Sequence, residues 1–166
     1  MSGISIAIIT LSDKGSRGER EDLGGPLIRE MIGEIGAEVK YYEIIPDEIE
    51  LIKEKLIEYS RKVDLIFTTG GTGLSPRDVT PEATLAVIDR EIPGIAEAMR
   101  LEGLGKTKRA MLSRAVAGIR GNALIINLPG STKAVKEGLA AVMDVLVHAV
   151  EKIKGSTDDC AAGEGV

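Results

Sequence analysis

The chain has 166 residues, of which 43% are hydrophobic and 28% are charged, and its formal net charge is -5. This size and composition are typical of a globular domain, and the acidic balance argues against a surface that coats nucleic acid. Apolar runs such as 4–11 and 123–128 are too short to cross a bilayer. With no export signal in view and one cysteine, Cys160, we expect a cytoplasmic protein without nucleic-acid or membrane partners.

The first half of the chain alternates strand and helix patterns. Residues 4–11 are a continuous β-branched run, which predicts a strand buried on both faces, and a polar loop follows through Asp22. Apolar residues at helical spacing over 23–35 predict a helix that ends at Gly36. The further elements expected are a strand over 39–45, a helix over 49–59 and a strand over 63–69.

The middle of the chain begins with a helix-start signal. Thr80-Pro81-Glu82 combines a capping hydroxyl, a first-turn proline and an acid near the positive end of the helix dipole. Residues 83–105 then have a helical pattern that is broken at Pro93-Gly94. We therefore expect one interrupted helix over this stretch.

The last third of the chain predicts a hairpin and a long helix. Segments 116–119 and 123–128 flank Arg120-Gly121-Asn122, which favours a hairpin and hence one antiparallel edge strand. A helix is expected over 132–154, and residues 155–166 are expected to be a disordered tail. The whole alternation predicts a single domain over 1–154 with a three-layer α/β/α fold and a mostly parallel sheet.

Unusual sequence falls where the predicted strands end. The segments are Ser12-Asp13-Lys14, Pro46-Asp47, residues 70–78 and residues 128–133. Ligands of such folds bind outside the carboxyl ends of the strands, where these four loops meet. Their convergence predicts one binding site.

The loop Gly70-Gly71-Thr72-Gly73 is the most distinctive of the four. Its glycines let the backbone approach a ligand and turn N–H groups toward an anion. The hydroxyls of Thr72 and Ser75 add donors, and Arg77 adds positive charge. The loop matches neither a dinucleotide-binding fingerprint nor a Walker A motif, and the alternative interpretation is a flexible strand-to-helix turn.

The segment Leu128-Pro129-Gly130-Ser131-Thr132-Lys133 leads from a strand into a helix. Free N–H groups, the helix dipole and Lys133 together favour a phosphate or a carboxylate. Ordinary capping of the helix by Ser131 or Thr132 accounts for the segment equally well. Both interpretations stay open at this point.

Several motifs together resemble the MogA/MoaB family, to which the N-terminal domain of gephyrin belongs. The longest is T-G-G-T-G-L-S-P-R-D-V-T-P-E-A-T, residues 69–84. Ser12-Asp13 falls where the family has its first ligand loop, and the resemblance extends over residues 4–154. The remaining motifs are Ile45-Pro46-Asp47-Glu48, Met111-Leu112-Ser113-Arg114 and Asn127-Leu128-Pro129-Gly130.

The resemblance implies molybdenum cofactor biosynthesis on a molybdopterin-binding fold. The implied activity is that of a molybdopterin adenylyltransferase, a nucleotidyltransferase that moves the adenylyl group of ATP onto the terminal phosphate of molybdopterin and releases pyrophosphate. It implies Mg²⁺ as the cofactor, ATP as co-substrate, and a homotrimer or a hexamer. The molybdenum-insertion protein of the pathway is a further implied partner, and a tungsten pathway stays open.

Carried over by the resemblance, Asp47 and Asp78 handle magnesium and catalysis, while Ser12, Asp13, Ser113 and Arg114 contact pterin or nucleotide. Lys14 stands where the family often has an arginine, and an ammonium group cannot make a bidentate phosphate contact. From the residues alone, Asp47 is favoured as a helix cap before Ile49, a role that can coexist with catalysis. Ser113-Arg114 is equally a solvated helix end. Because Thr80 is expected to cap the next helix, Asp78 is expected to be free for another role.

A non-catalytic molybdopterin-binding or scaffold homologue is the main alternative. The presence of both Asp47 and Asp78 favours the enzyme, because a pure binding protein has less need of two metal-positioning acids. The lone His148 is expected to be a packing or helix-end residue. With no cluster of histidine and cysteine in the sequence, zinc is excluded on ligand number.

Overall fold

The structure is a computed structural model that describes residues 3–157. Cys160 and residues 158–166 of the predicted tail lie outside the described residues. Within the described part of the chain, we find no helix that combines the length and the apolar character needed to span a membrane.

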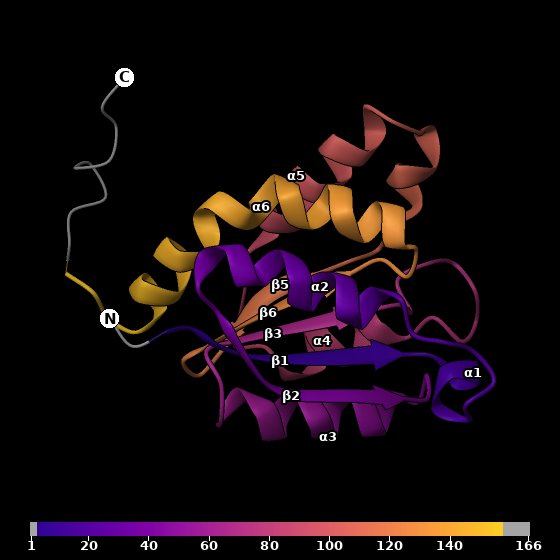
Figure 1. Ribbon diagram of the computed structural model, residues 1–166, viewed down its shortest axis with the longest axis horizontal. Coiled ribbons are helices and arrows are strands. Elements are labelled where there is room, and N and C mark those ends of the chain that lie inside the picture. Colours follow the sequence, from indigo (N-terminus) through magenta and orange to yellow (C-terminus); the bar gives the residue numbers. More distant parts are fainter. Residues whose placement is uncertain (1–2, 158–166) are drawn as a thin grey trace.

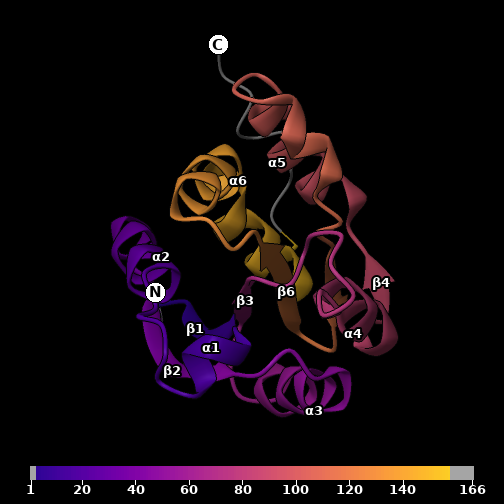
Figure 2. The same ribbon diagram turned by 90° about the vertical axis from the view of Figure 1, so that its right-hand side faces the viewer.

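One six-stranded sheet forms the centre of the molecule, in the order β2-β1-β3-β6-β5-β4 (Figures 1 and 2). Neighbours among β2, β1, β3 and β6 are parallel, whereas β5 is antiparallel to both of its neighbours. The predicted α/β fold with antiparallel pairing at one edge is therefore confirmed. The strands are β1 (Ser5–Leu11), β2 (Glu38–Ile45), β3 (Leu65–Thr69), β4 (Arg90–Glu91), β5 (Ala117–Arg120) and β6 (Ala123–Leu128).

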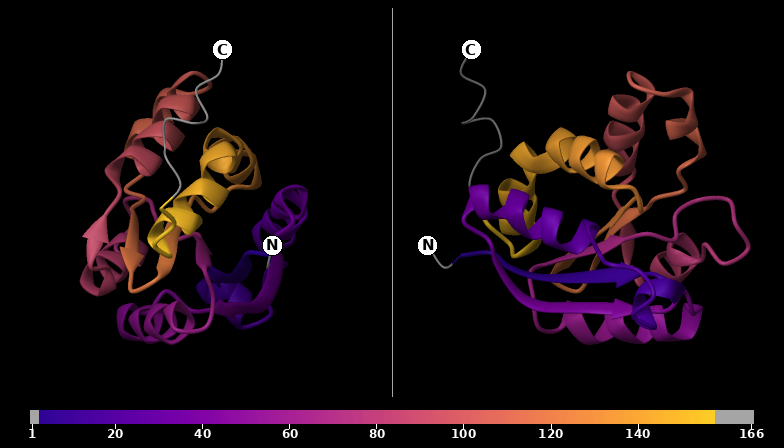
Figure 3. Two further views of the ribbon diagram at one scale, coloured as in Figure 1. Left: turned by 90° about the vertical axis from the view of Figure 1, so that its left-hand side faces the viewer. Right: turned by 45° about the vertical axis from the view of Figure 1, so that its right-hand side comes forward.

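Helices cover both faces of the sheet (Figures 2 and 3). On one face lie α2 (Gly24–Ile32), α5 (Pro93–Leu104) and α6 (Thr132–Ile153), and on the other lie α3 (Ile49–Ser60) and α4 (Thr80–Val87). The short elements are α1 (Asp13–Ser16) and the 3-10 helices η1 (Gly33–Ile35) and η2 (Lys108–Leu112).

The strand β1 explains why the sheet is buried on both sides. Ile6 and Ile8 belong to the core beneath α2, α5 and α6, while Ala7 and Ile9 belong to the core beneath α3 and α4. Successive side chains of a strand point to opposite faces, so an apolar run without alternation fills two cores at once. This is the physical basis of the continuous apolar run at residues 4–11.

The helix expected over 83–105 with a break at Pro93-Gly94 is confirmed at both ends but is wrong over residues 88–92. The helix α4 ends at Val87, and Arg90–Glu91 form the edge strand β4 instead. Pro93 then stands in the first turn of α5, and the residue before it, Ile92, has a non-helical backbone. A proline disfavours the helical conformation of its predecessor, so residues 88–92 are free to pair with β5.

The polar loop expected after β1 begins with a helical turn, α1. The Ser12 side chain accepts a hydrogen bond of 2.9 Å from the Gly15 amide and so caps this turn. Gly36 ends the next helical segment with φ of 70°, as predicted. The carboxyl ends of the parallel strands point to the side on which α1 lies (Figure 1).

Candidate functional site

Two adjoining cavities lie at the carboxyl ends of the parallel strands. The charged cavity has a volume of about 880 Å³, and its lining includes Asp13, Lys14 and Asp47. The apolar cavity has a volume of about 690 Å³. It runs between α5, α6 and the loop over residues 70–78, here named the glycine loop. Both are lined by Gly71, Asp78, Gly130 and Ser131, so the two cavities meet at these residues.

The turn after β3 requires glycine at two successive positions. Gly70 has φ of 99°, and a Cβ atom there would lie 2.5 Å from the Leu11 carbonyl oxygen. Gly71 has φ of 68°, and its Cβ would lie 2.2 Å from the Thr80 hydroxyl oxygen and 3.1 Å from Asp47 Oδ1. The close approach brings this loop against the carboxylate of Asp47.

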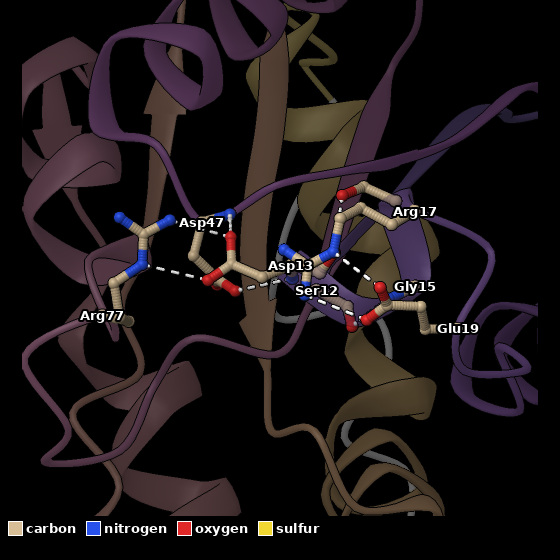
Figure 4. Close-up of polar contacts among 8 residues, drawn as sticks. Ser12, Asp13, Gly15, Arg17, Glu19, Asp47 and Arg77 are labelled. Carbon is tan, nitrogen blue, oxygen red and sulfur yellow. Dashed lines mark hydrogen bonds and ion pairs between the residues drawn. The ribbon is translucent and has the colours of Figure 1, made fainter.

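Asp47 is not a helix cap. The N-cap of α3 is Glu48, and no side chain caps that helix. Asp47 is instead interlocked with Asp13: the Asp13 amide donates to Asp47 Oδ2 at 3.2 Å, and the Asp47 amide donates to Asp13 Oδ1 at 3.0 Å (Figure 4). The capping interpretation is therefore wrong, and the carboxylate faces the charged cavity.

Arg77 joins this interlock from the glycine loop. Its Nε donates to Asp13 Oδ2 at 3.0 Å and its Nη2 to Asp13 Oδ1 at 2.8 Å (Figure 4). The Arg77 side chain is 60% exposed and that of Asp13 27%. Asp13 thus ties its own loop to the loops of Asp47 and Arg77.

The pKa values of the two interlocked acids move in opposite directions. Burial raises the pKa of Asp47, and the charges of Asp13 and Asp78 add to the increase, while a hydrogen bond from Asp13 and the charge of Arg77 oppose it. The hydrogen bond from Arg77 is the main reason that the pKa of Asp13 lies below its usual value. Asp47 is therefore the acid of this pair whose charge would gain from a nearby cation.

Asp78 belongs to a tight turn within the glycine loop. Its Oδ2 accepts a hydrogen bond of 2.9 Å from the Ser75 amide, and its own amide donates to the Ser75 carbonyl at 2.9 Å. Thr80 does not cap α4, because Val79 is the N-cap; the Thr80 hydroxyl donates to the Gly70 carbonyl instead. The expectation about Thr80 is wrong, and one oxygen of Asp78 is engaged within its own loop.

The structure brings most of the predicted site residues together at the two cavities. Ser12, Asp13, Asp47 and Gly70 line the charged cavity only. Thr72, Gly73, Ser113 and Pro129 line the apolar cavity only. Gly71, Asp78, Gly130 and Ser131 line both, whereas Ser75, Arg77, Arg114 and Lys133 line neither.

The capping interpretation of the segment before α6 is confirmed. Ser131 is the N-cap of this helix, and its hydroxyl oxygen accepts a hydrogen bond of 3.2 Å from the Ala134 amide. The same residue borders both cavities, so capping and a place in the site coexist.

Asp22 is a cavity residue that the sequence interpretation missed. Its carboxylate accepts hydrogen bonds from the Thr10 hydroxyl at 2.8 Å and from the amides of Gly24 and Gly25 at 3.1 and 3.2 Å. The Tyr42 hydroxyl donates to it as well. An aspartate directly before Leu-Gly-Gly at a helix start was the available signal, since such a side chain satisfies free N–H groups.

The wall formed by α5 was also missed. Met99 and Arg100 line the apolar cavity, and Arg100 Nη1 donates to the carbonyls of Ser113 and Ala115 at 3.3 and 3.0 Å. No local motif marks these two residues, because the cavity exists only where α5 packs against α6.

The donor set of the site fits a hard divalent cation. Within residues 3–157 we find no group of three or more histidine, cysteine, aspartate or glutamate side chains that would hold a metal by themselves. Asp47 and Asp78 line the same cavity. Magnesium is usually held by one or two carboxylates together with waters and substrate phosphates, which matches such a pair.

Comparison with known proteins places this geometry in a family. The chain is 43% identical over 160 residues to the Molybdopterin adenylyltransferase of Helicobacter pylori (strain ATCC 700392 / 26695), covering 94% of this chain and 91% of that protein. It is 42% identical over 156 residues, 92% of the chain, to the Molybdenum cofactor synthesis protein cinnamon of Drosophila melanogaster, of which it spans 26%.

A solved structure is similar over nearly its full length. The crystal structure of the molybdopterin biosynthesis enzyme MoaB from Thermus thermophilus superposes with a TM-score of 0.87 at 52% identity, covering 92% of this chain and 98% of that one. The family described as "Probable molybdopterin binding domain" matches residues 7–148. The chain therefore belongs to the molybdopterin-binding family of MogA and MoaB.

Proposed function

We propose that this protein is a molybdopterin adenylyltransferase of molybdenum cofactor biosynthesis. The observation that carries the proposal is the meeting of two cavities at Gly71, Asp78, Gly130 and Ser131. A reaction that joins two large substrates needs two adjoining pockets and a shared junction at which their reacting atoms come together. The name of the Helicobacter pylori relative supports this choice of reaction.

In the proposed reaction, an oxygen of the terminal phosphate of molybdopterin attacks the α-phosphorus of ATP. The new phosphorus–oxygen bond forms as the bond to the β-phosphate oxygen breaks, and pyrophosphate leaves. Negative charge must be brought together at the junction, so positioning and charge stabilisation are the main tasks of the protein. The narrow glycine turn leaves room for backbone N–H groups to approach the phosphates.

Asp47 and Asp78 are the carboxylates proposed to hold Mg²⁺, which when bound supplies positive charge to the reacting phosphates. Burial already disfavours the charged form of Asp47 and raises its pKa. A bound cation would stabilise that charged form. Asp13 keeps Asp47 in place through the reciprocal hydrogen bonds of the interlock.

Three further predictions belong to the same proposal. The protein is expected to act in the cytoplasm, to form a homotrimer or a hexamer built from two trimers, and to deliver its product to the molybdenum-insertion protein. A single folded domain over 1–154 is consistent with the continuous six-stranded sheet.

Pyrophosphate release from ATP tests the proposal. The purified protein is assayed with molybdopterin and Mg²⁺, and each component is omitted in turn. Release that needs both additions is the expected result. Tight molybdopterin binding without pyrophosphate release would overturn the enzyme and leave the binding or scaffold homologue.

A further inference from the structure

We propose that Arg114 is a positioning residue that holds the glycine loop, and that it does not contact substrate. The residues on either side of it, Ser113 and Ala115, line the apolar cavity. Arg114 itself lines neither cavity, and its side chain is 35% exposed. Its side chain therefore contacts the residues that line the cavities rather than the cavities themselves, although it stands inside a family motif.

The guanidinium group of Arg114 is occupied by the glycine loop and the start of α4. Its Nε donates to the Gly73 carbonyl at 2.8 Å, and its Nη2 donates to the Asp78 carbonyl at 2.7 Å. Its Nη1 pairs with the carboxylate of Glu82. The Arg114 amide adds a bond of 2.9 Å to the Thr72 carbonyl.

These contacts bracket the turn that carries Asp78. The turn closed between Ser75 and Asp78 ends at Asp78, and Gly73 lies two residues before its start, so one rigid guanidinium group joins the two sides of this turn. A planar guanidinium can make such divergent contacts at once, whereas an ammonium group on a flexible stem cannot. Arg114 thus acts on Asp78 through the backbone. Glu82 binds the remaining nitrogen of the guanidinium group, Nη1, and so fixes its orientation.

The test is amide hydrogen exchange of the glycine loop in the full chain without ligand. In Arg114→Lys, which keeps the charge, the hydrogen-bonded amides of Ser75, Asp78 and Thr80 are expected to exchange about tenfold faster or more. Glu82→Gln is expected to speed the same amides by a smaller factor. Unchanged exchange in a folded Arg114→Lys overturns the proposal, and if that variant fails to fold, unchanged exchange in Glu82→Gln overturns it.

Arg120→Lys is the matched control. Arg120 ends β5, the strand that follows Arg114 in the chain, and it also donates to a backbone carbonyl, that of Val87 at 2.7 Å. It lines neither cavity. Exchange of the glycine-loop amides is expected to match that of the parent protein. If the glycine-loop amides exchanged equally fast in Arg120→Lys and in Arg114→Lys, the loss of any arginine near β5 would explain the effect. That result would overturn the specific role of Arg114.

The kinetic arm rests on the proposed function. Arg114→Lys is expected to lower kcat for pyrophosphate release about 10- to 100-fold with little change in KM for ATP, as for loss of a group that supports a metal ligand. A raised KM at unchanged kcat would make Arg114 a substrate contact and overturn the proposal. If the parent protein releases no pyrophosphate, the proposed function fails while the exchange experiment still decides the role of Arg114.

Discussion

Asp47 differs from a helix-capping aspartate because both of its polar functions face another loop. Its carboxylate accepts from the Asp13 amide, and its amide donates to the Asp13 carboxylate. This arrangement fixes the direction of one acid beside a cavity that Asp78 also lines. At the scale of single residues, the site thus contains one pair of acids, Asp13 and Asp47, whose relative positions are fixed by hydrogen bonds.

Asp47→Asn separates charge from shape at this position. The amide keeps an oxygen acceptor for Asp13 and nearly the same volume, and no helix cap is lost, so the melting temperature should stay close to that of the parent. Turnover should fall about 100-fold or more, because a group that stabilises transition-state charge is lost. Pyrophosphate release and thermal unfolding measure the two effects, and an active variant would remove Asp47 from the mechanism.

The acid side of the pH–rate profile should depend on Arg77. Binding of a cation needs the ionised form of Asp47, whose pKa burial raises above 3.8, so activity should be lost as pH falls through that raised value. Arg77 opposes the increase, and Arg77→Met should therefore move the acid limb of kcat to higher pH. Lys62→Met, in a surface pair with Glu58, serves as the control; a shift in both variants would contradict the assignment.

Arg77 should also affect stability in acid. Its hydrogen bond lowers the folded-state pKa of Asp13, so the pair stabilises the fold above the ordinary pKa of 3.8 and this contribution is lost as pH falls through the lowered value. The exposed position of Arg77 keeps the contribution small.

At the scale of elements, the turn after β3 determines how closely the loop and α4 approach the acids. Gly71→Ala places a Cβ at positive φ against the Thr80 hydroxyl and near Asp47. We expect a loss of about 1–2 kcal/mol in the free energy of unfolding from the backbone conformation alone, together with a clear loss of activity. Chemical denaturation and the pyrophosphate assay measure both.

Gly33→Ala is the control for that variant. Gly33 has φ of -57°, and nothing lies within 4 Å of a Cβ placed there. Its stability should be unchanged or slightly increased, since alanine restricts the unfolded chain. Equal destabilisation of both variants would mean that the turn has no special requirement for glycine.

Apolar periodicity in the sequence predicted the strands and helices that have a buried face. It did not predict a strand that has no buried face and forms only by pairing with its neighbour. The five longer strands and the last helix follow apolar patterns that any packed sheet needs. The two-residue strand β4 has exposed side chains, so no apolar pattern marked it. Its existence depends on pairing with β5, which lies more than 20 residues away in sequence.

The candidate site was predictable to the extent that its loops follow strands. Asp13, Asp47 and Asp78 line the charged cavity as the strand ends suggested. Which side chains turn inward was not predictable: Arg114 points to backbone carbonyls while its neighbour Ser113 lines a cavity. That choice depends on the path of a loop that is remote in sequence.

At the scale of the whole molecule, several large apolar side chains remain exposed. Leu101 in α5 is 72% exposed and Met111 in η2 is 58% exposed, and these two elements pack against each other. Apolar side chains gathered at a surface favour association with another protein surface. We therefore propose Leu101 and Met111 as candidates for the contact between copies of the chain.

Sedimentation analysis of the full chain should give a mass of three times 17.6 kDa, or six times that value for the hexamer. Dilution over a tenfold range tests whether the assembly is stable. A mass of 17.6 kDa at every concentration would contradict the expected assembly and leave the apolar side chains for another partner.

The position of β6 has a consequence for synthesis on the ribosome. It is the last strand in chain order among the described residues, yet it lies between β3 and β5. Until residues 123–128 emerge, the nascent chain leaves β3 with an unpaired edge that can pair with another chain. Gly130 and Ser131 follow β6 after Pro129, so the two-cavity junction needs this strand in place. We therefore expect binding competence to arise late in translation rather than gradually.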